Sequence, residues 1–211
     1  MQDQTWTEAE QTRLREDALR YVIPHFASNA ELEKGPKIFT RGEGCYVYDC
    51  DGNKYLDTFA TLLTTVCGHC RSEVTDVVAE QMGRLEFFPN YVDTFTIPLI
   101  DLARELAEIM PGELEVSFFV NSGSEANETA LKMARQYQYI SGNHMKTKVI
   151  SRRGQYHGST PTAMAVGNRG RPAHGIFDPL SPAAIQVDPP YCYRCPWGFQ
   201  GRTNGDCCML S

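Results

Sequence analysis

The feature that most restricts how this chain can fold is a strand, loop and helix pattern in the second half of the sequence. Residues 116–120 form a short apolar run, residues 121–124 have the composition of a turn, and residues 125–140 repeat apolar side chains at helical spacing. Residues 148–151 read as the next strand, and after Gly167 the sequence is rich in Gly and Pro with little periodicity. Because strands that alternate with helices build covered sheets, this order predicts an α/β fold.

The first half of the chain predicts three helices and a hairpin. Thr7 and Glu10 have capping-box spacing at the start of a helical pattern that Pro24 stops. Residues 45–56 alternate around a Gly-containing turn, which predicts a β-hairpin. The other two helices are expected at residues 72–85 and from Pro98 to the Pro-Gly pair at 111–112.

Composition limits the classes of partner. Twenty Lys and Arg stand against 26 Asp and Glu, so the formal charge is −6, which argues against a nucleic-acid partner. No stretch approaches the roughly 18 consecutive apolar residues of a spanning helix, so no membrane partner is expected. The N-terminus lacks the apolar core of a secretory signal, so we expect a cytoplasmic protein whose eight cysteines are mostly thiols.

Two loops carry residues that could bind a ligand. Ser122, Gly123 and Ser124 precede a helix, where free amides and the helix dipole favour an anion such as phosphate. A purely structural alternative is a capping box between Ser122 and Glu125.

The second loop follows the next predicted strand. Tyr156, His157 and Gly158 lie there, and ligands of open α/β sheets gather at the carboxyl ends of strands. The two loops could therefore face one ligand, with the Tyr156 ring stacked on a flat aromatic phosphate ester. Alternatively, Tyr156 is a packed loop aromatic and His157 a structural residue.

These residues also carry a family resemblance. The run at residues 120–128, Val-Asn-Ser-Gly-Ser-Glu-Ala-Asn-Glu, followed by Tyr156-His157-Gly158, resembles the class III aminotransferases, the ω-transaminase group of fold-type I pyridoxal-phosphate enzymes. Residues 44–57 and 68–70 are similar to that family's N-terminal strands and the loop into its large domain. The resemblance implies an N-terminal segment of the small domain at residues 1–60. It also implies the first, incomplete part of the large mixed or parallel-sheet domain at residues 61–211.

The resemblance further implies a cofactor, pyridoxal 5′-phosphate. By it, the amides of Gly123 and Ser124 and the Ser124 hydroxyl hold the phosphate, with Ser122 in the same loop. Tyr156 stacks on the pyridine ring, and His157 beside it is a candidate cofactor-binding residue. The reaction implied is transfer of an amino group from an amine or ω-amino acid to a keto acid, and the complete protein is expected to be a homodimer.

The chain departs from the family at the catalytic residues. The family's Schiff-base lysine and the acid that pairs with the pyridine nitrogen are expected beyond the last residue of this sequence, so no catalytic residue is assigned. We therefore expect the 211-residue chain to resemble the N-terminal part of a transaminase and to be inactive alone. None of the lysines stands in the family's lysine context; they are Lys34, Lys37, Lys54, Lys132, Lys146 and Lys148.

Other functions stay open at this point. The chain could be a truncated, non-catalytic remnant that binds the cofactor or a partner chain. Cys67 and Cys70 form a C-x-x-C pair before a helical pattern, which is typical of thiol–disulfide chemistry. A zinc site is the remaining alternative, with four thiolates from Cys192, Cys195, Cys207 and Cys208.

Overall fold

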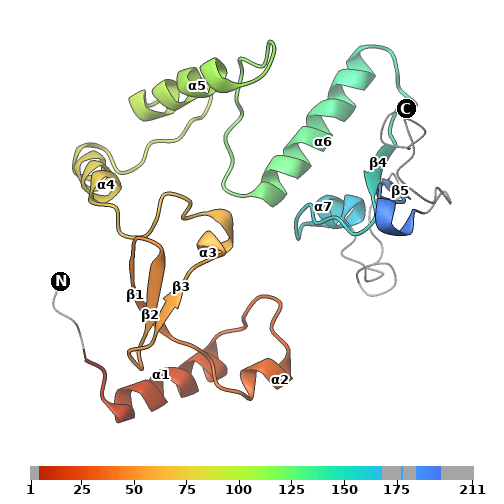
Figure 1. Ribbon diagram of the computed structural model, residues 1–211. Helices are drawn as coiled ribbons and strands as arrows, with labels where there is room; N and C mark the ends of the chain where they lie inside the picture. The colour runs from red at the N-terminus through yellow and green to blue at the C-terminus, as the bar shows by residue number, and fades with distance from the viewer. Residues whose placement is uncertain (1–4, 168–176, 178–183, 196–211) are drawn as a thin grey trace. The chain divides into compact units, whose positions relative to one another are not determined.

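The computed structural model describes residues 5–167, 177 and 184–195 (Figure 1). The chain divides into two compact units, Met1–Ile100 and Asp101–Ser211. The domain boundary predicted at residue 60 concerns the complete protein and stays a prediction.

The first unit opens with a helix whose start follows from its sequence. α1 spans Glu8–Tyr21, and the Thr7 hydroxyl accepts a hydrogen bond from the Glu10 amide at 3.3 Å. The Glu10 carboxylate in turn accepts from the Thr7 amide at 2.9 Å, so two amides that a helix start leaves unpaired gain partners. The predicted capping box is confirmed. Ser28 and Glu31 repeat the arrangement at the short helix α2, Asn29–Leu32.

A three-stranded antiparallel sheet follows. It consists of β1 (Phe39–Glu43), β2 (Tyr46–Asp49) and β3 (Lys54–Leu56), with β2 in the middle. The β2–β3 pair confirms the predicted hairpin, whereas β1 was not predicted. Asp49 organises the turn, because its buried carboxylate accepts from the amides of Asp51 and Asn53 at 3.0 and 2.9 Å.

Three helices complete the first unit and lead out of it. They are α3 (Ala60–Leu63), α4 (Ser72–Arg84) and α5 (Ile97–Ile109), of which α4 and α5 were predicted. α3 is unusual because its four residues, none of them glycine, have φ values from 46° to 67°. That region is the left-handed one, which costs an L-residue about 1–2 kcal/mol.

The second unit contains the predicted long helix and a parallel strand pair. α6 spans Gly123–Ile140, which begins two residues earlier than expected. β4 (Val149–Arg152) pairs in parallel with β5 (Ala184–Val187), and the connection between them contains α7 (Pro161–Val166). A short 3₁₀ turn, η1, follows at Cys192–Arg194.

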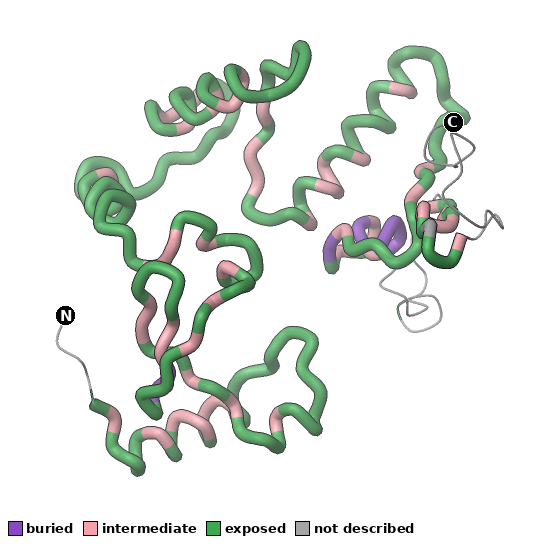
Figure 2. The backbone as a smooth tube through the Cα atoms, in the orientation of Figure 1, coloured by how far each residue is buried: buried purple, intermediate pink, exposed green. Residues whose placement is uncertain are grey.

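Burial in the second unit centres on α7. Among the described residues, its buried apolar side chains are Ala163, Ala165 and Val166. Figure 2 colours part of α7 purple for this burial. α7 contacts β4, β5 and α6, so this short helix joins the strand pair to the long helix. No helix in the described ranges has the length and apolar character that crossing a membrane requires.

Two sequence expectations were wrong in this unit. Residues 116–120 do not form a strand; they pair with no other strand in the described part of the chain, and Val116 is 97% exposed. An apolar run supplies side chains, but a strand also needs a neighbour for its amides and carbonyls. Conversely, β5 is a strand that was not predicted. Its four residues pair with β4, which is far away in sequence.

Candidate functional site

The start of α6 carries two backbone amides that are candidates for binding an anion. Ser122 is the N-cap, and its hydroxyl accepts from the Glu125 amide at 3.2 Å. The amides of Gly123 and Ser124 have no hydrogen-bond partner among the described residues. Free N–H groups at the positive end of an 18-residue helix suit an anion.

Glu125 sits in the first turn of α6, where its charge bears on whether an anion can bind. Its carboxylate accepts from the amide of Asn121 at 2.7 Å instead of the Ser122 amide that a full capping box requires. Of the capping box between Ser122 and Glu125, only the bond from the Glu125 amide to the Ser122 hydroxyl is therefore formed. The carboxylate is engaged with Asn121, so it does not take the amides of Gly123 and Ser124.

The second candidate loop is attached to the first turns of α6. The Ser124 hydroxyl accepts from the Ser159 amide at 3.0 Å, and the Asn127 side-chain amide donates to the His157 carbonyl at 2.6 Å. The structure thus brings together the two loops, which are more than thirty residues apart in sequence.

Gly158 allows this close approach. Its φ is +135°, and a Cβ built there would lie 2.6 Å from the Ser124 oxygen and 2.8 Å from the Ala163 Cβ. Contacts that short do not occur between real side chains, so any larger residue must push the loop away from α6.

Tyr156 and His157 occupy this loop in different ways. The Tyr156 side chain is 52% exposed, and its hydroxyl lies 3.1 Å from the Ser159 hydroxyl. This exposure does not match a fully packed loop aromatic. His157 is half-buried, and its backbone carbonyl accepts the hydrogen bond from Asn127 of α6. Their predicted roles toward a cofactor stay predictions.

Sequence reasoning missed two residues of α6 that fasten the loop. One is Asn127, described above. The other is Glu128, whose Oε1 accepts from the amides of Thr162 and Ala163 at 2.9 and 3.2 Å. Burial acts to raise the pKa of Glu128, but hydrogen bonds from Thr162 and Ala163 at the start of α7 outweigh it and leave the pKa below its usual value. The sequence carries only a weak signal for this role of Glu128, because glutamate is common on helix surfaces.

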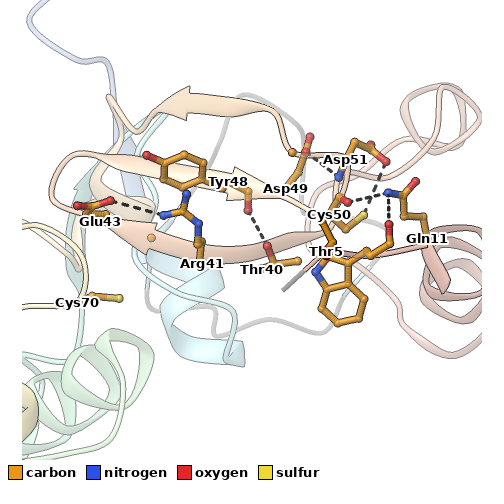
Figure 3. Close-up of a pocket in the computed structure, with 13 residues that line it drawn as sticks. Thr5, Gln11, Thr40, Arg41, Glu43, Tyr48, Asp49, Cys50, Asp51 and Cys70 are labelled. Carbon is orange, nitrogen blue, oxygen red and sulfur yellow. Dashed lines mark hydrogen bonds and ion pairs between the residues drawn. The ribbon is translucent and has the colours of Figure 1, made fainter. Parts of the chain in front are cut away.

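A separate cavity of about 850 Å³ lies in the first unit, between the N-terminal residues and the sheet. Figure 3 shows Arg41, Tyr48 and Glu43 along one side and Cys50 with Gln11 at the other. The Arg41 guanidinium lies 3.5 Å from the centre of the Tyr48 ring. None of the residues predicted to bind the cofactor lines this cavity.

The first unit also holds a histidine–carboxylate pair. His69 Nε2 lies 2.9 Å from Asp57 Oδ2, and Asp57 also accepts from the amides of Phe59 and Thr61. The hydrogen bond from His69, aided by those amides and opposed by burial, lowers the pKa of Asp57. This carboxylate therefore holds the left-handed turn α3.

The cysteine pairs are the remaining alternatives that the sequence left open. Cys67 and Cys70 are exposed free thiols. Within the described residues, no group of three or more His, Cys, Asp or Glu side chains could hold a metal. The side chain of Cys192, and Cys207 and Cys208, lie outside the described residues, so the predicted zinc site is not tested.

Comparison with protein families identifies one match over most of the chain. The family model described as aminotransferase class-III matches residues 28–201. Adenosylmethionine-8-amino-7-oxononanoate aminotransferase of Geobacter sulfurreducens is 38% identical over 186 residues, covering 88% of this chain and 41% of the relative. The chain spans about two fifths or less of the curated relatives it matches.

Solved structures agree with this match. An (S)-enantioselective ω-transaminase from Thermomicrobium roseum superposes with a TM-score of 0.83 at 36% identity, covering 93% of this chain and 43% of that one. An ω-transaminase from Pseudomonas jessenii in complex with PMP superposes with a TM-score of 0.80 at 33% identity, covering 87% and 40% of the two chains.

Proposed function

Since this chain belongs to the class III aminotransferases, whose members use pyridoxal phosphate, we propose that it forms the cofactor-phosphate site of a transaminase. The reaction is the transfer of an amino group from an amine or ω-amino acid to a keto acid. The cofactor, when bound, supplies the electron sink for that transfer. We place the whole protein in the cytoplasm as a homodimer that acts on small molecules.

The observation that carries the proposal is the pair of amides at Gly123 and Ser124, which find no partner in the described part of the chain, beside the attached second loop. These amides would donate to phosphate oxygens. The Ser124 hydroxyl accepts from Ser159, so its own proton remains to be donated to the same phosphate. Ser122 caps the helix and so keeps the amides directed outward.

The second loop supplies a flat surface. The Tyr156 ring is half-exposed, and a pyridine ring stacked on it would gain the stabilisation typical of aromatic pairs, about 0.5–1.5 kcal/mol. His157 lies in the same loop, and its carbonyl bond to Asn127 helps to hold Tyr156 in place.

We assign no catalytic role to a lysine of this chain. Lys132 lies on α6 but is exposed and more than two turns past Ser122, and a helical side chain leans toward the helix N-terminus by about one turn only. Binding and orientation of the cofactor are therefore the proposed work of these residues. A non-catalytic remnant would also bind and orient the cofactor, but it would show no turnover, either alone or together with a partner chain.

A titration with 4′-deoxypyridoxine 5′-phosphate tests the proposal, because this analogue has the ring and phosphate but no aldehyde to react with surface lysines. A Cβ built at Gly123 has no described atom within 4 Å outside its own stretch of α6, so the position has room for the larger side chain of Gly123→Val, which should obstruct the ligand. We expect affinity to fall by about tenfold or more, equivalent to about 1.4 kcal/mol.

The matched control is Gly83→Val in α4, where a Cβ likewise has no described atom within 4 Å outside its own stretch of helix. It should bind as the unaltered chain does. Equal affinity of Gly123→Val and the unaltered chain would refute the phosphate site.

A further inference from the structure

Glu128 does the work of a helix cap from a distant part of the chain. α7 begins with Pro161, which has no N–H, and its N-cap Thr160 makes no side-chain capping bond. The next two amides, of Thr162 and Ala163, both donate to Glu128 Oε1. The carboxylate of one helix therefore satisfies amides that the start of another leaves unpaired.

This bond belongs to a set of three along one side of α6. Asn127 and Glu128 follow Ser124 by three and four residues, so the three side chains lie on the same face of the helix. They bond, respectively, to the Ser159 amide, the His157 carbonyl and the start of α7. One face of α6 thus holds the whole segment from His157 to Ala163.

The two ends of that segment differ in what they do. Its beginning directly follows Tyr156 and is bonded to α6 through the His157 carbonyl, whereas its end enters α7, where Ala163 is fully buried. Glu128 binds at the buried end. Gly158 packs against both Ser124 and Ala163, so a shift of α7 displaces the loop as well.

We propose that Glu128 is a positioning residue for the cofactor site: by accepting from Thr162 and Ala163, it keeps the Tyr156 loop seated against the first turn of α6. This inference rests on the proposed function, since the site that it positions is the proposed phosphate and ring site. Glu128 itself touches no ligand.

The test combines ligand affinity with amide hydrogen exchange. Exchange is measured at Ser159, Thr162 and Ala163, and affinity with 4′-deoxypyridoxine 5′-phosphate. Glu128→Ala should speed exchange at all three amides and weaken binding by about five- to tenfold, the effect of losing one or two hydrogen bonds. Glu108→Ala, at an exposed position on α5, is the matched control and should change neither readout.

Two conservative variants separate the effect of the hydrogen bond from the effect of the charge. They also replace Glu128→Ala in the test if that variant does not fold. Glu128→Gln keeps an oxygen at the same reach and should restore affinity to within about twofold, as a neutral acceptor loses only part of a charged hydrogen bond. Glu128→Asp keeps the charge but is one methylene shorter, so it should bind as weakly as Glu128→Ala. Tighter binding of the analogue by Glu128→Asp than by Glu128→Gln would overturn the inference.

The remaining outcomes distinguish this inference from the proposed function. Faster exchange at Thr162 and Ala163 with unchanged Ser159 exchange and unchanged affinity would make Glu128 a local cap and overturn the inference alone. If the unaltered chain does not bind the analogue, the proposed function fails and this inference fails with it.

Discussion

The Ser124 hydroxyl oxygen lies 3.0 Å from the backbone nitrogen of Ser159 and accepts its hydrogen bond, which joins the start of α6 to the loop before α7. A hydroxyl can accept and donate at once, so this bond leaves the Ser124 proton for a second partner. Attachment of the loop and binding of a phosphate are therefore compatible at one side chain.

The close packing of Gly158 predicts that its replacement disrupts the site. Gly158→Ala places a Cβ 2.6 Å from the Ser124 oxygen, and we expect unfolding free energy to fall by about 1–3 kcal/mol, the usual cost of overpacking. Chemical denaturation measures this loss. Gly142→Ala is the control, because Gly142 also has positive φ but open space around it. Equal losses in the two variants would mean that backbone strain, not the contact, is responsible.

Tyr156 is predicted to contribute ring stacking. Tyr156→Ala should weaken binding of 4′-deoxypyridoxine 5′-phosphate by roughly 1 kcal/mol, in the range of aromatic pairs. Tyr156→Phe keeps the ring, loses the hydroxyl and its contact with Ser159, and should bind more tightly than the alanine variant. Titration of both variants, with Tyr137→Ala on α6 as the control, checks the assignment. An alanine variant that binds as well as the phenylalanine variant would exclude stacking.

The left-handed turn α3 should open in acid. Asp57 has a lowered pKa because of its hydrogen bond with His69 and the amides of Phe59 and Thr61. A carboxylate whose pKa is lower in the folded state contributes its stabilisation above its ordinary pKa of about 3.9 and loses it as pH falls through the lower folded value. Protonation of Asp57 weakens its hydrogen bond with the Thr61 amide, so the proton chemical shift of that amide should move in strong acid.

Asp57→Asn removes the titrating group and should abolish that acid transition. Asp76→Asn, at an exposed position in α4, should leave it unchanged. A Thr61 amide shift with the same pH profile in wild type and Asp57→Asn would show that Asp57 does not control the turn.

The last prediction concerns turnover. We expect the 211-residue chain to show no amino transfer by itself, because we expect none of its lysines to take the place of the family's Schiff-base lysine. General acid–base catalysis by a positioned group typically accelerates a step by about 10²–10⁴-fold, and that contribution would be missing. The chain is incubated with pyridoxal phosphate, reduced with borohydride and mapped by mass spectrometry. Labelling of a single lysine together with cofactor-dependent turnover would contradict the prediction.

Several elements followed from the sequence alone because their determinants are local. The capping box at Thr7, the turn at Gly52 and the start of α6 at Ser122 depend on neighbours within a few residues. The run from Val120 to Glu128 together with Tyr156, His157 and Gly158 was also enough to indicate the family, which the comparisons confirmed.

Tertiary structure decided what depends on residues far apart in the chain. Residues 116–120 are apolar yet have no strand partner in the described ranges, whereas β5 is a strand because β4 pairs with it. The same holds for Glu128, whose role depends on amides 34 and 35 residues later. Local pattern determines what a segment can form, but hydrogen bonds to a distant partner determine whether it forms and what it holds, because unpaired backbone groups cost free energy wherever water is excluded.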